Sequence, residues 1–147
     1  MKKAIRFVCI ILICSLFFTV TAQAVNVVEP KASAFFAAYG TDLYKTSSTS
    51  FQIWFDVTAN AWTSMQELGA SEITLYRSLD KQTWSSVKLY QKSVYSQMVA
   101  QNTTSHIDYV TYNYATSGYY YRARITFYGK NSTGIGEKDV YTEIIKM

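Results

Sequence analysis

The stretch that decides the fold is FQIWFDV, residues 51–57. Every second side chain in it is apolar, and these are Phe51, Ile53, Phe55 and Val57. Gln52, Trp54 and Asp56 stand between them. Because successive side chains of a strand point to opposite faces, this alternation predicts a β-strand with one buried face.

A second stretch with the same period runs from Tyr119 to Tyr128. One of its faces carries Tyr119, Tyr121, Ala123, Ile125 and Phe127. The other carries Tyr120, Arg122, Arg124, Thr126 and Tyr128. The first set lacks charge, so we expect it to face the core and the second set to face outward.

Shorter strand patterns fill the rest of the chain, separated by clusters of turn-forming residues. We expect strands over residues 35–45 (broken at Gly40), 72–78, 84–90, 106–114 and 140–146. Turns are expected at residues 46–50, 80–82, 115–118 and 129–138, the last with Gly134 and Gly136. Over residues 61–70 we expect a helical turn or a packed loop, because Trp62, Met65 and Leu68 are three apart. Residues 91–105 are expected to form a long connection. About seven short strands predict an all-β fold, a single antiparallel β-sandwich.

The first residues have the pattern of a secretory signal peptide. Lys2, Lys3 and Arg6 precede an apolar run from Phe7 to Val20, and Ala22-Gln23-Ala24 forms an A-x-A site. We therefore expect a signal peptide over 1–24, a short tail over 25–32 and one sandwich domain over 33–147. An uncleaved membrane anchor is the alternative, although the run is shorter than the ~20 residues that span a bilayer. The mature product is expected to be secreted, with no stable membrane insertion.

Removal of the signal peptide changes what the composition implies. Loss of its three basic residues lowers the formal net charge from +4 to +1. This removes the electrostatic argument for nucleic acid as a partner. Cys9 and Cys14, the two cysteines of the chain, leave with the same segment. The mature domain is therefore expected to have no disulfide and no zinc–thiolate site.

Three segments resemble a fibronectin type III domain: the 51–57 strand, the 73–90 hairpin and Ser117 to Phe127. Ser117-Gly118-Tyr119-Tyr120-Tyr121 is similar to the tyrosine corner by which that family enters its sixth strand. The layout also resembles small secreted proteins of Clostridia-type Gram-positive bacteria, for which no defined activity is implied. Trp54 departs from the family because it is out of phase with the apolar face, and the proline before the corner is absent. A different immunoglobulin-like topology therefore stays open.

The sequence contains no pattern for catalysis. His106 is the only histidine, and we interpret it as a solvated surface residue. The carboxylates are scattered, with no paired-acid or metal-ligand spacing. The Ser78–Trp84 segment predicts a hairpin turn in which Asp80 caps the backbone and Trp84 packs beside it. We expect no catalytic residue, no cofactor and no metal.

The candidate binding surface is the outward face made by Tyr76, Tyr120, Arg122 and Arg124. A fibronectin-like sandwich places the sixth strand beside the third, whose outward residues are Glu72, Thr74 and Tyr76. Tyrosine and arginine are the residue types enriched at binding hot spots. The alternative is that an Arg–Tyr ladder only stabilises an exposed sheet.

These observations favour a secreted, non-catalytic binding module for an extracellular protein or glycan. A bacteriocin-like or membrane-acting antagonist is the alternative, although the net charge and the lack of a basic amphipathic helix oppose it. An enzyme whose site assembles only in three dimensions is the third possibility. The oligomeric state stays open.

Overall fold

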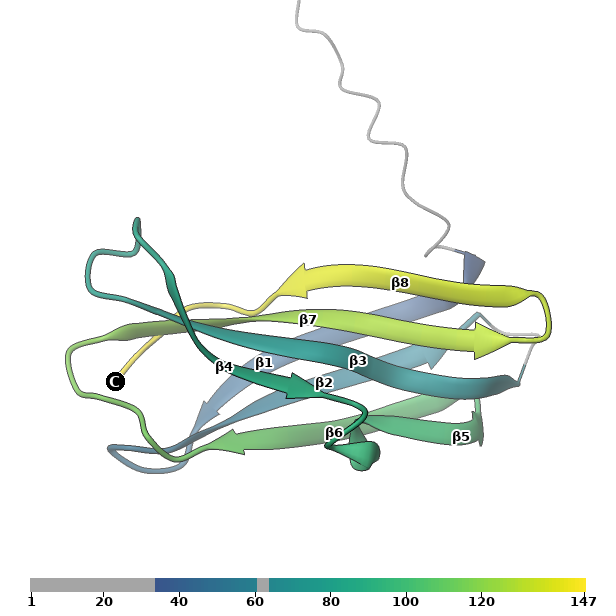
Figure 1. The fold of residues 1–147 in the computed structure, drawn as a ribbon, viewed down its shortest axis with the longest axis horizontal. Helices are drawn as coiled ribbons and strands as arrows, with labels where there is room; N and C mark the ends of the chain where they lie inside the picture. Colours follow the sequence, from purple (N-terminus) through teal and green to yellow (C-terminus); the bar gives the residue numbers. More distant parts are fainter. Residues whose placement is uncertain (1–33, 61–63) are drawn as a thin grey trace, which may run out of the picture.

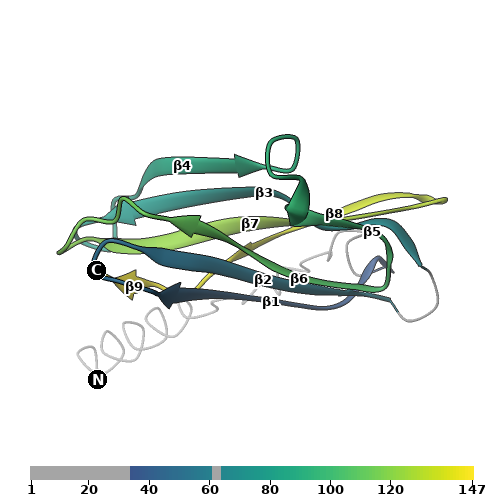
Figure 2. The same ribbon diagram turned by 90° about the horizontal axis from the view of Figure 1, so that it is seen from below.

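A computed structural model describes residues 34–60 and 64–147. The predicted signal peptide, the predicted tail and Trp62 lie outside the described residues. The described chain forms two antiparallel β-sheets that pack face to face, which confirms the all-β prediction (Figure 1). The two layers are seen edge-on in Figure 2.

Sheet A has three strands in the order β1-β2-β6. They are β1 (Phe36–Lys45), β2 (Phe51–Ala59) and β6 (Ser105–Tyr112). The central strand β2 contains the stretch that opened the sequence analysis. Its residues alternate between buried and less buried along the strand, as its period of two predicts.

Sheet B has six strands and is built on two long neighbours, β3 (Met65–Ser78) and β7 (Tyr120–Asn131). Beside them run β4 (Ser85–Gln91), β5 (Val99–Thr103), β8 (Gly134–Tyr141) and β9 (Ile145–Lys146). Strands β4 and β5 pair with successive halves of β3, while β8 and β9 pair with β7. The direct pairing of β3 with β7 confirms the expected neighbours.

The core lies between the two sheets. Strand β2 contributes Phe51, Ile53, Phe55 and Val57, and β7 contributes Tyr121, Ala123, Ile125 and Phe127, all at most 1% exposed. Full burial of one such large apolar side chain contributes about 1.5–3 kcal/mol. The ring of Tyr121 lies 5.2 Å from that of Phe51 and 6.1 Å from that of Tyr112, so it connects the two layers.

The predicted break of the first strand at Gly40 is wrong. Strand β1 runs through it, and Gly40 pairs with Asp56 of β2. A Cβ at this position would meet the Asp56 carboxylate, so the glycine makes room for a neighbouring side chain. The irregularity of β1 lies instead between Phe36 and Ala38.

The predicted helical turn or loop over residues 61–70 is also wrong from Met65 onward, where β3 begins. Met65 and Leu68 are both fully buried. Because residues three apart in a strand face opposite sides, this end of β3 is covered on both faces, which mimics a helical spacing.

The long connection predicted over 91–105 contains a 3-10 turn, Ser96–Met98, and strand β5. Strand β5 has a polar sequence, VAQNT, and lacks a period-2 pattern. It lies so close to β3 that a Cβ on Gly69 would meet the backbone of Met98 and Val99. Its position therefore depends on a contact between distant backbones rather than on its own side chains.

The predicted turn over 129–138 is wrong except at its centre. Strands β7 and β8 continue through it and leave Ser132 and Thr133 between them. Gly136, expected in the turn, lies in β8, where a Cβ would meet the ring of Phe35. The expected last strand is divided, because β8 ends at Tyr141 and β9 is a separate short strand.

Candidate functional site

The register of sheet B brings the four predicted surface residues together. Tyr76 pairs with Arg122, while Arg124 pairs with Thr74 and Tyr120 with Ser78. Tyr76, Tyr120, Arg122 and Arg124 are all half-buried rather than exposed. Thr74, on the same outward face, is only 7% exposed. This face is therefore covered by its own side chains.

Arg122 contacts two aromatic rings, one from the loop before β4 and one from β8. Its guanidinium carbon is 4.2 Å from the ring centre of Trp84 and 4.8 Å from that of Tyr141. The Tyr141 ring in turn lies 6.5 Å from the ring of Tyr76. These contacts between cation and rings are attractive in themselves, without any ligand.

The remaining members of the face are also engaged. Arg124 contacts Glu72 at 3.0 Å and Asp139 at 3.9 Å. The ammonium groups of Lys81 and Lys146 lie over the ring of Tyr120, at 4.6 and 5.3 Å from its centre. The geometry is that of a cross-strand ladder, which stabilises the sheet. A binding role for these residues stays a prediction.

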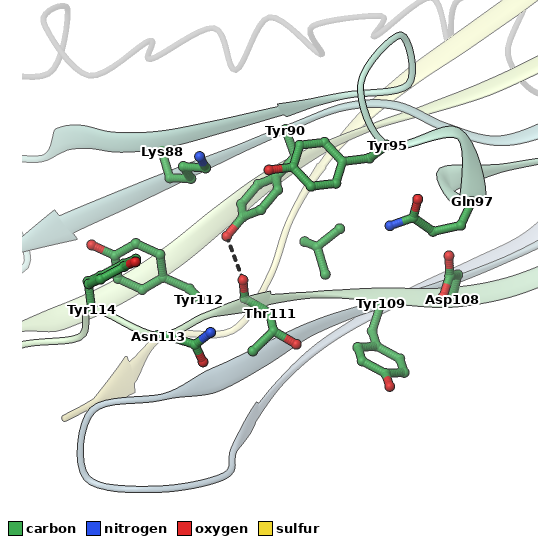
Figure 3. A pocket seen from close by; sticks show the side chains of 11 residues that line it. Lys88, Tyr90, Tyr95, Gln97, Asp108, Tyr109, Thr111, Tyr112, Asn113 and Tyr114 are labelled. Atoms are coloured by element: carbon green, nitrogen blue, oxygen red, sulfur yellow. Dashed lines mark hydrogen bonds between the residues drawn. The ribbon is translucent and has the colours of Figure 1, made fainter.

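A groove opens between β4 and β6, the outermost strands of the two sheets on one side of the sandwich. Its volume is about 470 Å³. Five tyrosines border it, together with charged and amide side chains: Lys88, Gln97, Asp108 and Asn113 (Figure 3). We call this feature the edge groove. Sequence reasoning missed it, because its walls come from strands of different sheets.

One hydrogen bond crosses the edge groove. The Tyr90 hydroxyl donates to the Thr111 carbonyl at 3.0 Å, so it connects β4 of sheet B with β6 of sheet A. Burial raises the pKa of Tyr90, which keeps this phenol protonated as a donor. The Tyr95 ring meets the Tyr90 ring edge-on at 5.1 Å. Two contacts thus fix the position of the Tyr90 ring in the groove.

The edge groove also presents polar groups of both signs. The Lys88 ammonium lies 5.5 Å from the Tyr90 ring centre. Across the groove, Asp108 Oδ2 is buried with no hydrogen-bond partner among the described residues. Tyr114 is 81% exposed and forms the open end. The groove can therefore offer rings for stacking, an ammonium donor and a carboxylate acceptor.

The outer face of sheet A carries a second aromatic surface. The register places Asp42, Trp54 and Tyr109 in one row across the three strands, and Tyr44, Gln52 and Thr111 in the next. We call the residues Tyr44, Trp54 and Tyr109 the sheet A platform. The only signal of it in the sequence was the phase of Trp54, which the alternation of residues 51–57 places on the outward face.

His106 is not the solvated residue expected from the sequence. It is half-buried, and its Nε2 lies 2.9 Å from the Gln97 carbonyl. Its ring meets the ring of Phe55 edge-on at 5.8 Å. Its contacts connect β6 with the 3-10 turn and with the core, so His106 has a packing role.

Two features are absent from residues 34–60 and 64–147. No group of three or more His, Cys, Asp or Glu side chains within these ranges could hold a metal ion. No helix within them is long and apolar enough to cross a membrane.

Comparison with known proteins gave structural likeness only. No family model matches the chain, and no curated protein is similar to it in sequence. The fold is similar to Northeast Structural Genomics Consortium target SoR45, at 9% identity and a TM-score of 0.38 over 76% of this chain and 88% of that chain. It is also similar to a protein from Archaeoglobus fulgidus, at 4% identity and a TM-score of 0.37 over 76% of this chain and 97% of that chain. Similarity at this level carries no argument about function.

Proposed function

We propose that the protein is a secreted, non-catalytic binding module whose ligand occupies the edge groove. The observation that carries the proposal is the composition of this groove, in which tyrosine rings surround a volume of about 470 Å³ with Lys88 and Asp108 facing it. Concave sites with aromatic walls and a few convergent polar groups are the usual form of a ligand site. Secretion rests on the signal pattern of residues 1–24.

The chemistry of the groove favours an extracellular glycan as this ligand. A sugar ring has an apolar face that stacks on a phenol ring and a rim of hydroxyls that donate and accept hydrogen bonds. Tyr95 and Tyr114 would supply the rings, while Gln97, Asp108 and Lys88 would supply partners for the hydroxyls. Asp108 lines the groove, and a carboxylate accepts hydrogen bonds from hydroxyl groups.

We further propose that the sandwich is of the fibronectin type III-like or immunoglobulin-like kind. Two features support this. The strand pairing agrees with the resemblance. A fibronectin-like sandwich places its third and sixth strands side by side, and the strands in these places here, β3 and β7, pair with each other. In addition, the Tyr121 hydroxyl accepts a hydrogen bond from the Thr116 N–H at 2.9 Å, which is the backward contact of a tyrosine corner.

The test is binding of the purified mature protein to an array of soluble extracellular glycans. Tyr114→Ala and Tyr95→Ala are expected to weaken binding at least about tenfold, since each removes a stacking ring worth ~1.4 kcal/mol or more. Titration calorimetry on the best glycan would measure the change. Tyr114 is the sharper variant, because its exposure means that the core does not depend on it.

The matched control is Tyr120→Ala with Arg122→Ala, which removes aromatic and cationic groups from β7, a strand that does not border the groove. This variant should bind as the wild type does, provided that its melting curve shows a folded protein. If it abolishes binding while Tyr114→Ala does not, the Tyr/Arg face is the site and the edge groove is not. A partner recovered only among cell-surface proteins would contradict the glycan assignment.

A further inference from the structure

The sheet A platform has an orientation fixed in advance of any ligand. Trp54 Nε1 donates to Gln52 Oε1 at 2.9 Å, which sets the tilt of the indole. The Tyr109 ring packs beside it, with centroids 4.6 Å apart and an interplanar angle of 31°. Side chains held in this way lose little rotamer freedom when a ligand binds, so less of the binding free energy is lost to ordering.

The platform is open, in contrast with the aromatic residues on the other sheet. Tyr44 is 61% exposed and Tyr109 is 38% exposed, and Ile107 beside them is 68% exposed. Among the described residues, no Lys or Arg lies over the rings of Tyr44, Trp54 or Tyr109, whereas Trp84 and Tyr120 are each covered by a cation. Contiguous apolar surface of this kind on a soluble domain commonly marks a binding site.

A shallow hollow of about 360 Å³ lies over the platform, bordered by Asp42, Tyr44, Gln52 and Trp54. Its rim carries hydrogen-bonding groups. Asp42 Oδ1 accepts the Leu43 N–H at 2.7 Å, which holds the carboxylate in place beside the rings. The Gln52 oxygen is used by Trp54, so its amide nitrogen can donate to a ligand. Rings below and hydroxyl partners at the rim match a pyranose ring that lies flat.

The charge of this face decides between classes of glycan. Asp42 and Asp56 are the residues charged at neutral pH among those that the strand pairing places on the outer face of sheet A. A negative face repels sulfated, uronic or sialylated chains and nucleic acids, but it accepts hydrogen bonds from neutral hydroxyls.

We propose that the sheet A platform is a second binding site, separate from the edge groove, and that it takes flat pyranose rings of a neutral polysaccharide. The inference does not require the edge groove to bind a glycan. Tyr109 borders both features, so Trp54 and Tyr44 are the residues that distinguish them.

The test is depletion of the purified mature protein from solution by insoluble cellulose and, in parallel, by insoluble chitin. We expect the wild type to bind at least one of them. Trp54→Ala and, independently, Tyr44→Ala should weaken this binding about tenfold, equivalent to ~1.4 kcal/mol. Tyr44 is 61% exposed and lies outside the core formed by the described residues, so its variant stays informative even if Trp54→Ala folds poorly.

Trp84→Ala is the matched control, because it removes the same side chain from the opposite sheet and should leave the depletion unchanged. Tyr114→Ala should also leave the depletion unchanged. Failure of this proposal and failure of the proposed edge-groove site therefore show in different variants.

Wild-type protein that binds neither solid, or equal binding by Trp54→Ala, Tyr44→Ala and wild type, would overturn the proposal. Stronger binding to polygalacturonate than to the neutral solids would overturn it as well. So would a concentration-dependent dimer that Trp54→Ala abolishes, because a second copy would then cover the platform.

Discussion

At the scale of single residues, Asp80 shows how one side chain shapes a hairpin. Its Oδ1 accepts the N–H groups of Gln82 and Thr83 and the hydroxyl of Ser78, each at 2.8 Å. Lys81, inside this turn, has a positive φ of 62°. Trp84 closes the loop by donating from Nε1 to the Lys81 carbonyl at 3.1 Å. The predicted cap and the predicted packing of Trp84 are both confirmed.

This turn makes stability depend on pH in the acid range. The hydrogen bond from the Thr83 N–H, followed by those from Gln82 and Ser78, lowers the pKa of Asp80 from 3.8 to about 2. Because the folded pKa is the lower one, the carboxylate stabilises the fold above pH 3.8, and this contribution is lost as the pH falls towards 2. Asp80→Ala should therefore lower the urea midpoint by a constant amount above about pH 4 and by progressively less between pH 4 and 2.

Thr83→Ala is the control, because the Thr83 backbone N–H is the donor and survives the substitution. It should keep the wild-type dependence on pH. A difference between wild type and Asp80→Ala that is as large at pH 2 as at pH 7 would contradict the assignment.

At the scale of elements, the outer faces of the two sheets differ in kind. Strand β7 carries Arg122 and Arg124, which lie over the ring of Tyr141 or pair with acids of β3 and β8. The outer face of sheet A has no such pairing among its described residues, and its rings stay open. Similar aromatic content thus produces a stabilised face on one sheet and an available one on the other.

Arg122 contacts two aromatic rings on the outer face of sheet B. Arg122→Ala should lower the free energy of unfolding by about 1 kcal/mol, since the guanidinium is half-exposed and partly screened. Arg122→Lys should lose part of this, because an ammonium does not stack flat on Trp84 and Tyr141. Urea denaturation would measure both, with Lys138→Ala of β8 as the control expected to change little. Equal stability of all three variants would show that the ladder contributes nothing.

At the scale of the whole molecule, the two sheets are held together by the buried core and, at the open edge, by contacts that include the hydrogen bond from Tyr90 to Thr111. Tyr90→Phe removes the donor to the Thr111 carbonyl and keeps the ring. It should lower the free energy of unfolding by about 1 kcal/mol, the usual net contribution of such a bond. In the same groove, the Tyr95 hydroxyl has no hydrogen-bond partner among the described residues, so Tyr95→Phe should change stability less. Urea unfolding curves of the two variants would measure this difference, and a larger loss for Tyr95→Phe would be inconsistent with the inter-sheet role.

The sequence was sufficient for elements whose pattern is local. Strand β2 and most of β7 follow from alternation, and the Asp80 turn follows from its residue types. Gly40 and Gly136 were misinterpreted because each accommodates a side chain from a distant segment, which no local pattern records. Strand β5 was missed because its pairing with β3 depends on the close approach of two backbones at Gly69.

The sequence by itself determined the all-β class, the inward set of β2 and β7 and the outward phase of Trp54. These depend on the period of two along a single strand, which is a local property of the extended backbone. Only the tertiary structure decided which outward face is available. Arg122 meets Trp84 and Tyr141 across strands, and β4 and β6 border a groove across sheets. Such contacts join residues that are far apart in the chain, so they exist only after the sheets have paired and packed.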